Sequence, residues 1–321
     1  MTGTWRRKWV PLRFRAGDII LFEPRIDVWE STSYFADIAP LETPGELPML
    51  RELGGASGCL VRSQPTAVPL PAVQFANGFL RYVPQQYNRY VIDLTGTFET
   101  YLAKFSAKTR STLKRKVRKF ADASGGTIDW RSYRTPADIE AFHASARRLS
   151  ERTYQERLLD AGLPDSEAFR SEMAALATSG EVRAYMLFLK GEPVGYLYCP
   201  VRRGVLIYEY LGYDPRVRDL SPGTVLQVLV LESLFAEGRF RAFDFTEGEG
   251  DHKRLFSTTS QYCADVFVLR PTARNLLLVA SQLSLDKGSR AAAMVVERLG
   301  LKSRLKQWIR RLGRSPRPAV D

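Results

Sequence analysis

Two carboxylates in apolar, strand-like segments have the clearest potential for acid–base chemistry. Glu209 stands in the run Leu206–Leu211, which is otherwise apolar and aromatic, and Asp244 stands in the short run Arg241–Phe245. Burial disfavours the charged form of a carboxylate and raises its pKa, so either side chain could accept a proton near neutral pH. The alternative is that Glu209 faces solvent or pairs with an arginine. The sequence therefore offers Glu209 first, and Asp244 second, as a general base.

The elements around these carboxylates are predicted to form a strand–helix–strand unit. The first strand covers Val205–Tyr213 and the second covers Arg241–Phe245. Between them, Ser221 suits an N-cap and is followed by proline and glycine, and the helix is predicted to stop at Gly238. Apolar residues cover most of the helix circumference, which indicates burial against a sheet. This order predicts a right-handed unit with two parallel strands.

The start of this helix is a predicted anion site. A helix N-terminus presents free N–H groups and a partial positive charge, and here Arg216 and Arg218 precede it. The alternative is that Ser221, Pro222 and Gly223 only cap a core helix while the arginines keep the loop soluble. The coincidence of the cap, the two arginines and the sheet favours a role in binding phosphate.

The composition is that of a soluble globular protein. The 321 residues are 45% hydrophobic and 26% charged, no apolar run is long enough to cross a bilayer, and the N-terminus has no signal-like apolar region. The three cysteines are far apart and fit neither a zinc site nor a disulfide framework. We therefore expect a cytoplasmic protein that needs no metal ion.

The net charge of +12 is concentrated in two segments. Residues 104–119 hold eight basic residues and no acid, and Arg110, Lys114 and Arg118 share one face of the helix expected there. This face is either a solvated surface or a site for an anion. Residues 270–321 hold twelve basic and three acidic residues and end in a basic amphipathic helix. That helix either packs on the protein or contacts an anionic membrane surface.

The remaining pattern predicts a mixed α+β protein. Helices are expected at Thr97–Phe120 with a hinge near Ser106, at Pro136–Gln155, at Ser166–Thr178, and from His252 to about Ser257. Further strands are expected at Gly126–Tyr133, Val182–Leu189, Val194–Val201 and Ala264–Leu269. Short β-like runs in the first 95 residues are Asp18–Phe22, Gly58–Arg62, Gly78–Val83 and Tyr90–Leu94.

Four segments resemble the GNAT acyltransferases, in particular the branch linked to cellulose and exopolysaccharide biosynthesis, which is related to the Fem-type aminoacyltransferases. Arg218–Gly223 (RDLSPG) is similar to the R/Q-x-x-G-x-G/A pyrophosphate loop, with a serine where glycine is common. Phe105–Phe120 (FSAKTRSTLKRKVRKF) resembles the S-x-K-x-R-x-x-L-R-R block, and Gly191–Pro200 (GEPVGYLYCP) resembles the third-strand region. Asp244–Lys253 resembles the D-F-x-x-G-x-x-x-Y-K segment, with His252 where tyrosine is common.

The resemblance implies a GNAT-like fold with acetyl-CoA or another acyl-CoA as the donor. Its sheet would be mixed and mostly antiparallel, flanked by helices, with a degenerate N-terminal half and a basic C-terminal tail. The implied donor-binding residues are Tyr210, Leu211, Arg216, Arg218, Leu220, Ser221, Pro222, Gly223 and Thr224. The implied catalytic residues are Glu209 or Asp244 as the base and His252 as the general acid. Arg110, Lys114 and Lys253 would contact the acceptor or the donor.

We therefore expect an enzyme that moves an acyl group from acyl-CoA to an amine or hydroxyl of a polar acceptor, such as a sugar or a polysaccharide precursor. The expected division of the chain is 1–95, 96–270 and 271–321, with the acyltransferase domain in the middle. One alternative is a Fem-type transferase whose donor is aminoacyl-tRNA, in which case residues 104–119 would bind nucleic acid. Another is a non-catalytic scaffold held by its basic tail at the inner face of a membrane.

Overall fold

The structure is a computed structural model that describes residues 5–16, 19–32, 54–153 and 162–298. Its strands are β1 (Arg6–Pro11), β2 (Phe14–Ala16), β3 (Ile19–Phe22), β4 (Arg25–Thr32), β5 (Gly58–Pro65), β6 (Val73–Ala76), β7 (Phe79–Asp93), β8 (Trp130–Tyr133), β9 (Val182–Leu189), β10 (Glu192–Arg202), β11 (Val205–Ile207), β12 (Tyr210–Tyr213), β13 (Ala242–Asp244) and β14 (Thr259–Leu269). Its helices are α1 (Phe98–Ala103), α2 (Ala107–Ala123), α3 (Pro136–Ser150), α5 (Glu167–Thr178), the 3-10 helix η4 (Pro215–Leu220), α6 (Pro222–Glu237), α7 (Asp251–Phe256) and α8 (Ala273–Arg298).

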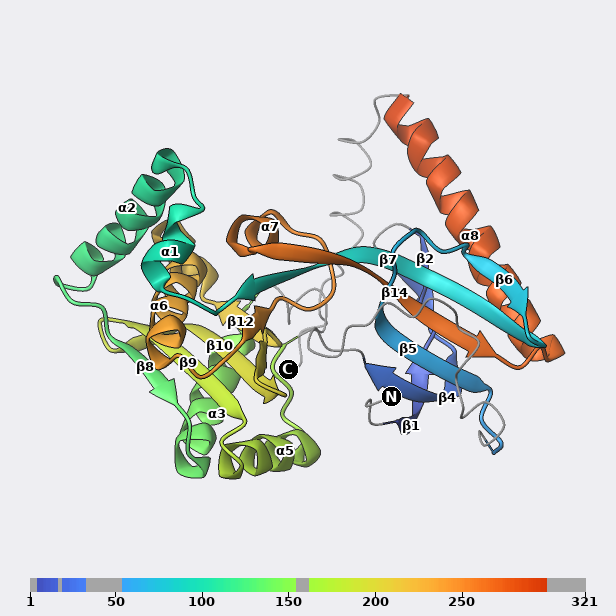
Figure 1. The fold of residues 1–321 in the computed structure, drawn as a ribbon, viewed down its shortest axis with the longest axis horizontal. Coiled ribbons are helices and arrows are strands. Elements are labelled where there is room, and N and C mark those ends of the chain that lie inside the picture. The colour runs from blue at the N-terminus through green and yellow to red at the C-terminus, as the bar shows by residue number, and fades with distance from the viewer. Residues whose placement is uncertain (1–4, 17–18, 33–53, 154–161, 299–321) are drawn as a thin grey trace, which may run out of the picture.

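One sheet runs through both halves of the molecule (Figure 1). Its strand order is β1-β4-β5-β14-β7-β13-β11-β10-β9-β8, with β12 paired to β10 and β6 paired to β7. The pairs β4–β5 and β11–β13 are parallel, and the other pairs of this sheet are antiparallel. The predicted α+β class with a mixed, mostly antiparallel sheet is therefore confirmed.

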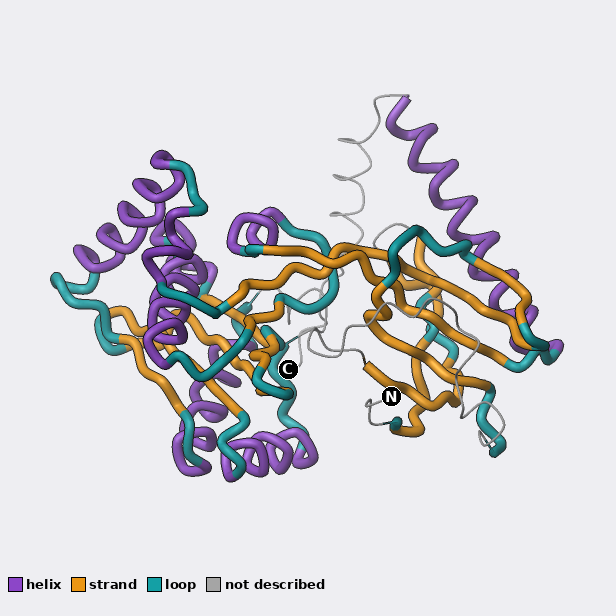
Figure 2. The backbone as a smooth tube through the Cα atoms, in the orientation of Figure 1, coloured by secondary structure: helices purple, strands orange, loops and turns teal. Residues whose placement is uncertain are grey.

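Helices gather on one half of the sheet, which we call the helical lobe (α1 to α6 with β8 to β13; Figure 2). On one face, α1, α2 and α6 enclose a core that includes Phe120, Val225 and Phe243. On the other face, α3 and α5 pack over β9 and β10 around residues such as Phe142 and Met173. Because α6 is buried on most sides, its apolar circumference has the role that the sequence predicted.

The other half, the N-terminal lobe (β1 to β6 and α8), is mostly sheet. Its core contains Val10, Ile26, Leu60 and Phe267, and the first turns of α8 pack on it through Val279. The basic helix predicted near the C-terminus, within 301–312, lies outside the described residues. No helix among the residues that the structure describes is long and apolar enough to cross a membrane.

Two long strands connect the lobes. β7 has 15 residues, and β14 pairs with it from Thr259, opposite Val91, to Leu269, opposite Leu80. The far end of β7 also pairs with β13 of the helical lobe. The sequence predicted two separate strands in this region, Gly78–Val83 and Tyr90–Leu94, whereas the structure has one continuous strand there.

The predicted parallel unit is confirmed as β11, α6 and β13. Helix α6 begins after Ser221 and ends at Gly238, which has a left-handed φ of 59°. The predicted hinge near Ser106 is also present, because the Ser106 side chain caps α2 by accepting a hydrogen bond from Thr109 N. Local signals of this kind identified both ends of α6 and the start of α2.

Candidate active site

The strand that follows β10 is divided at Tyr208 and Glu209, and this division lies at the centre of the candidate site. Up to Ile207, β11 pairs in parallel with β13. The next hydrogen bond between these segments runs from Tyr208 N to the carbonyl of Asp244 at 2.8 Å. Glu209 N instead donates to the carbonyl of Tyr198 at 3.3 Å, and β12 continues along β10. The two parallel strands therefore part at this point, which divides the predicted strand Val205–Tyr213.

The division also breaks the alternation of side chains. Tyr208, Leu211 and Tyr213 face the N-terminus of α6, whereas Glu209 and Tyr210 both face the side of α5. Successive residues of a regular strand point to opposite faces, so two neighbours on one face mark a bulge. As a result, Tyr208 and Glu209 open onto two different pockets on opposite faces of the sheet.

The first of these, the helix-end pocket, has a volume of about 460 Å³ and lies at the N-terminus of α6. Ser221 occupies the N-cap position with a left-handed φ of 55°, and its side chain makes no capping hydrogen bond. The expected serine cap is therefore absent, and the first N–H groups of α6 stay available to a ligand. The lining residues are Tyr208, Leu211, Tyr213, Arg218, Ser221, Pro222, Gly223, Thr224, Gly250, His252 and Lys253.

Cationic side chains surround the helix-end pocket. Arg218 and Lys253 line it, and Lys116 Nζ lies 3.4 Å from Thr224 Oγ1. Lys253 Nζ donates to the carbonyl of Glu247 at 2.5 Å, and burial lowers the pKa of this lysine. Positive charge combined with available backbone N–H groups suits the anionic oxygens of a phosphate or pyrophosphate.

His252 lies in the same pocket among aromatic rings. Its ring centroid is 6.5 Å from that of Tyr208, 5.9 Å from that of Phe245 and 4.8 Å from that of Phe256. Burial lowers the pKa of the His252 imidazole to about 4, and the charge of nearby lysines adds to the effect. His252 is therefore neutral at pH 7. A neutral imidazole can form a hydrogen bond, but it is a poor proton donor compared with the imidazolium that the predicted general acid requires.

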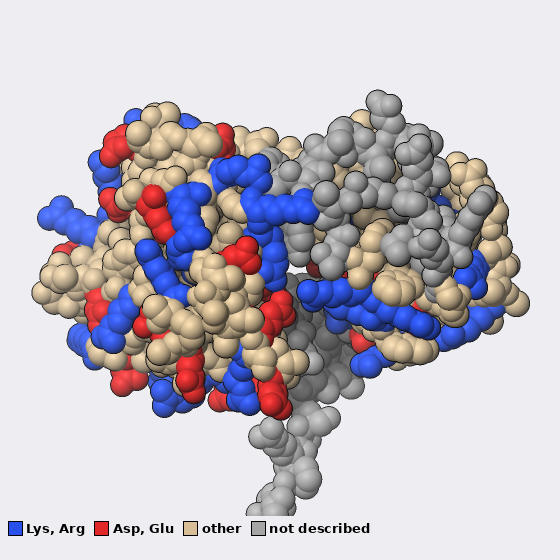
Figure 3. Space-filling view, turned by 60° about the horizontal axis from the view of Figure 1, so that its bottom comes forward, with Lys and Arg blue, Asp and Glu red and all other residues tan. Residues whose placement is uncertain are grey.

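The second pocket, the interlobe cleft, has a volume of about 510 Å³ and lies between the lobes. The N-terminal lobe contributes Arg6, Lys8, Glu30, Thr32, Arg62 and Ser63. The helical lobe and its adjoining strands contribute Arg89, Glu172, Pro200, Arg202, Ile207, Glu209, Thr246 and Glu247. Figure 3 shows the hollow between the two halves, with charged side chains on both of its edges.

Glu209 is the predicted base, and it opens into this cleft. Although its side chain is exposed there, the protein around it excludes much of the water that would solvate a carboxylate. This desolvation raises the pKa of Glu209 to about 7; Glu172 raises it further and Arg202 opposes the rise. Glu172 and Arg202 are themselves paired at 3.1 Å. A carboxylate with this pKa can both accept and return a proton near neutral pH.

Asp244, the second predicted base, has very different surroundings. It is fully buried in an ion pair with Arg89, with Arg89 Nη2 2.5 Å from Asp244 Oδ2. Its Oδ1 accepts hydrogen bonds from Arg89 Nε at 2.9 Å and from Thr246 N at 2.8 Å. Asp244 lines neither pocket, whereas Arg89 lines the cleft. These contacts suit a residue that positions Arg89 and, through its carbonyl, Tyr208.

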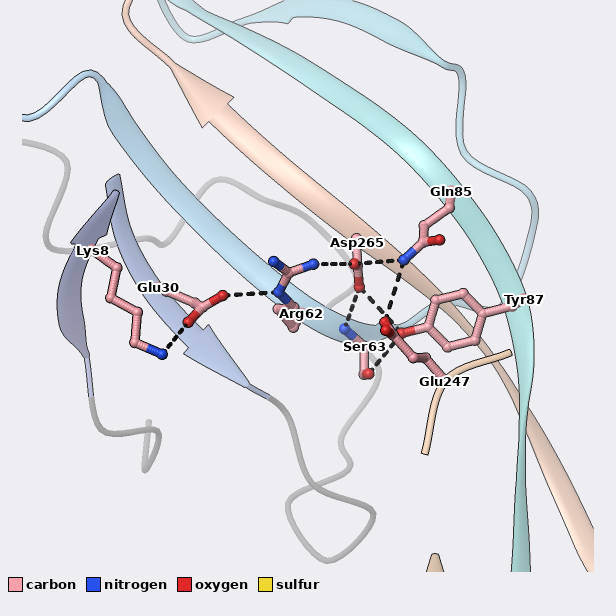
Figure 4. A network of polar contacts seen from close by, with 8 residues as sticks. All are labelled: Lys8, Glu30, Arg62, Ser63, Gln85, Tyr87, Glu247 and Asp265. Atoms are coloured by element: carbon pink, nitrogen blue, oxygen red, sulfur yellow. Dashed lines mark hydrogen bonds and ion pairs between the residues drawn. The ribbon is translucent and has the colours of Figure 1, made fainter. Parts of the chain in front are cut away.

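A polar network fixes the opposite wall of the cleft (Figure 4). At its centre, the carboxylate of Asp265 is 1% exposed and accepts hydrogen bonds from Ser63 N, Arg62 Nη1 and Gln85 Nε2, each at 2.9 Å. Gln85 Nε2 also reaches the Glu247 carboxylate at 3.3 Å. The network thus connects the N-terminal lobe with the loop that follows β13.

The structure brings together most of the residues predicted to bind the donor. Those that line the helix-end pocket are Leu211, Arg218, Ser221, Pro222, Gly223 and Thr224, together with His252 and Lys253. Three others lie elsewhere. Tyr210 packs on Phe169 at 5.6 Å on the opposite face, Arg216 pairs with Asp214 at 2.6 Å, and Leu220 packs against the core.

Two residues predicted to bind the acceptor, Arg110 and Lys114, line neither pocket. Arg110 Nη1 donates to the carbonyl of Phe105 at 2.5 Å, and Lys114 is exposed on α2. Sequence reasoning missed Lys116, which lies on the inner side of the same helix. The spacing of Lys116 from Leu113 and Phe120, the buried residues of α2, was the available signal.

The wall that the N-terminal lobe contributes was also missed. Lys8, Glu30 and Arg62 come from three different strands, and nothing local marks them as neighbours. Their proximity depends on the pairing of β1, β4 and β5, which sequence periodicity does not specify.

Residues 107–254 match the family model of an acetyltransferase (GNAT) domain. No curated protein matches the sequence. The structure is similar to the crystal structure of FemX, with 10% identity, a TM-score of 0.51, and coverage of 85% of this chain and 90% of that chain. It is also similar to the C-terminal DUF2156 domain of a putative lysylphosphatidylglycerol synthetase from Agrobacterium fabrum, with 10% identity, a TM-score of 0.50, and coverage of 80% and 84%. At these identities the likeness concerns the fold, which is GNAT-like as predicted.

Proposed function

We propose that this chain, which carries a GNAT-family acyltransferase domain at residues 107–254, transfers an acetyl or other acyl group from acyl-CoA to an amine or hydroxyl of a polar acceptor. The observation that carries this proposal is the division of the strand at Tyr208 and Glu209. These neighbours open onto two pockets on opposite faces of the sheet at the point where β11 and β13 part. A donor in one pocket and an acceptor in the other would meet there.

The helix-end pocket fits the donor. The N–H groups at the start of α6, with Arg218, Lys116 and Lys253 nearby, can hold a pyrophosphate. From there the donor's thioester arm would extend between the parting strands toward Tyr208, whose ring lies beside His252. A neutral His252 can form a hydrogen bond with the thioester or with the departing sulfur.

The interlobe cleft fits the acceptor. Glu209 would take a proton from the acceptor's amine or hydroxyl as its nitrogen or oxygen attacks the thioester carbonyl. The carbon–sulfur bond then breaks, CoA leaves as a thiolate, and a proton from the solvent or from protonated Glu209 restores the thiol. Glu209 suits this role because its pKa of about 7 lets it cycle between the two protonation states. The resemblance to the polysaccharide-linked branch makes an amino sugar one acceptor to test.

The test combines binding with turnover. Calorimetric titration with acetyl-CoA should show binding that Ser221→Glu weakens, because a carboxylate at the α6 N-terminus repels the donor's phosphates. Glu209→Gln should keep donor binding but lower thiol release, with an amine acceptor present, by at least about 100-fold. Glu232→Gln, on the exposed side of α6, is the matched control and should change neither quantity. Full turnover in Glu209→Gln would rule out this base.

A donor carried by tRNA is the second candidate. It is favoured by the exposed basic residues of α2, which include Lys114, Arg118 and Lys119 and lie next to the helix-end pocket, where Lys119 Nζ donates to the carbonyl of Asp219 at 3.0 Å. Such a surface binds nucleic acid with an affinity that falls steeply as salt is raised. If acetyl-CoA and longer acyl-CoAs fail to bind at low salt while aminoacyl-tRNA binds, this candidate replaces the first. Binding of neither donor would favour the non-catalytic scaffold.

A further inference from the structure

We infer that the interlobe cleft takes an acceptor with a cationic amine at one end and an anionic group at the other. The inference rests on the proposed function and specifies its acceptor. It follows from the charges that remain after the ion pairs within the cleft are accounted for. A ligand meets those remaining charges, because the paired ones already satisfy one another.

The N-terminal wall of the cleft has an excess of positive charge. Lys8 and Arg62 share the carboxylate of Glu30, each with a contact of 2.8 Å, and Arg62 also contacts Asp265 at 2.9 Å. Arg6 is exposed on the same wall and forms no ion pair with any residue in the described ranges. Three cations therefore face two carboxylates, and Arg6 is the cation with its charge still available.

The facing wall has an excess of negative charge. Its two arginines are already paired, Arg89 with Asp244 at 2.5 Å and Arg202 with Glu172 at 3.1 Å. Glu209 lines the cleft without an ion pair to any residue that the structure describes. Glu247 has no ion pair among those residues either, and it lies where the facing wall meets the Asp265 network through Gln85. In Figure 3 basic side chains lie along the right edge of the hollow, whereas the left edge carries both acidic and basic side chains.

This separation orients a ligand with two charged ends. An amine would be drawn to the unpaired carboxylates of the cleft, and at Glu209 its nitrogen would lie next to the base. An anionic group would contact Arg6, with Arg62 and Lys8 beside it. A carboxylate and a phosphate both satisfy that contact. A molecule with only one charged end would leave the charge of one wall without a partner, so specificity comes from requiring both.

The N-terminal wall is also held rigidly, which a selective site requires. The guanidinium of Arg62 is fixed between two carboxylates, one of them the buried Asp265, which the backbone N–H of Ser63 also holds (Figure 4). Little ordering of Arg62 is then needed when the anionic end binds beside it, so more of the interaction free energy with Arg62 appears as affinity.

The test compares matched acceptors with acetyl-CoA as the donor and thiol release as the readout. Each pair differs in the anionic group alone: 6-aminohexanoate against hexylamine, and glucosamine 6-phosphate against glucosamine. We expect kcat/KM to be at least about 10-fold higher for the zwitterion in at least one pair. Comparison of the pair that carries a carboxylate with the pair that carries a phosphate shows which anion the N-terminal wall prefers.

Three variants assign that preference to the wall. Arg6→Gln should remove most of the preference by raising KM for the zwitterion at least about 10-fold more than KM for the plain amine. Glu247→Gln should raise KM for both members of a pair. Arg13→Gln, an exposed arginine paired with Glu23 outside the cleft, is the matched control and should keep the preference.

Two results separate this inference from the proposed function. Equal kcat/KM for both members of both pairs, with thiol release dependent on Glu209, would overturn the two-charge acceptor and keep the acyltransferase. A preference that survives Arg6→Gln undiminished would also overturn the role of this wall. Absence of acetyl-CoA binding and of thiol release with every amine would instead overturn the proposed function itself.

Discussion

Glu209 and Asp244 are carboxylates on neighbouring strands whose surroundings push them toward different tasks. Asp244 is buried and is tied to Arg89 by two side-chain contacts. Glu209 has no such partner and lies where desolvation and the negative charge of Glu172 both favour the neutral form. Two acids with divergent environments are the usual arrangement when one must move a proton and the other must hold the site in place.

The pH dependence of turnover should report the environment of Glu209. A base must be deprotonated, so the rate should rise as pH increases through about 7, the pKa of this carboxyl. Glu172→Gln removes a negative charge, which lowers this pKa and should move the acid limb of the kcat/KM profile to lower pH. Arg202→Gln removes a positive charge and should move the limb to higher pH. Shifts of the same sign in both variants would contradict the assignment.

The role of Glu209 could be foreseen from the sequence because its cause is local. Apolar and aromatic neighbours on both sides of a carboxylate indicate desolvation wherever the strand packs. The partner of Asp244 could not be foreseen, since Arg89 is 155 positions earlier in the chain and nothing in periodicity joins the two. For the same reason the sequence did not predict that Arg6 and Arg62 line the cleft, because their positions depend on strand pairing between distant segments.

At the scale of elements, the chain pairs with β13 along β11 and then continues along β10 alone as β12. The pairing of Gly212 with Tyr196 is part of that course. A Cβ at Gly212 would lie 2.4 Å from the Tyr196 ring, which is 2% exposed and has its hydroxyl bound to Ser150 at 3.1 Å. Glycine is needed there because it lets the buried ring lie directly against the backbone.

Gly212→Ala should therefore destabilise the protein by about 1–3 kcal/mol, the usual cost of overpacking a tight core. Urea denaturation followed by circular dichroism would measure it. Gly223→Ala is the matched control, since a Cβ there meets ordinary contacts at 3.5 Å and beyond, and stability should change little. Replacing Tyr196 with leucine in the Gly212→Ala background should recover part of the loss. Wild-type stability of Gly212→Ala would show that β12 does not hold this register.

The end of α6 and the hairpin between β9 and β10 were predictable because their signals are short. Lys190 and Gly191, both with positive φ, join β9 and β10 as the sequence indicated, and Gly238 ends α6. The bulge at Glu209 and Tyr210 was not predictable, because an apolar run reads the same whether or not its alternation is broken. The site therefore depends on the bulge between β11 and β12, which hydrophobic periodicity does not detect.

At the scale of the whole molecule, β7 and β14 belong to both lobes. β14 lies between β5 and β7, and the C-terminal end of β7 pairs with β13 of the helical lobe. If either strand were removed, the strands next to it would become long edge strands with unpaired backbone groups in both lobes. Natural sheets avoid such exposed edges. The division of the chain at residues 95 and 270 stays a prediction, and these shared strands give a direct way to test whether it separates units that fold alone.

Because the lobes share these strands, we expect them to unfold in one cooperative transition. Tryptophan fluorescence reports mainly on the N-terminal lobe, which holds Trp5, Trp9 and Trp29, whereas far-UV circular dichroism reports mainly on the helical lobe. Urea titrations followed by the two signals should give one midpoint. Saturating acetyl-CoA, whose proposed pocket lies in the helical lobe, should raise both midpoints together, because a ligand stabilises the whole unit to which its site belongs. Separate midpoints, with only the circular dichroism midpoint raised by acetyl-CoA, would show instead that the two lobes unfold independently despite sharing β7 and β14.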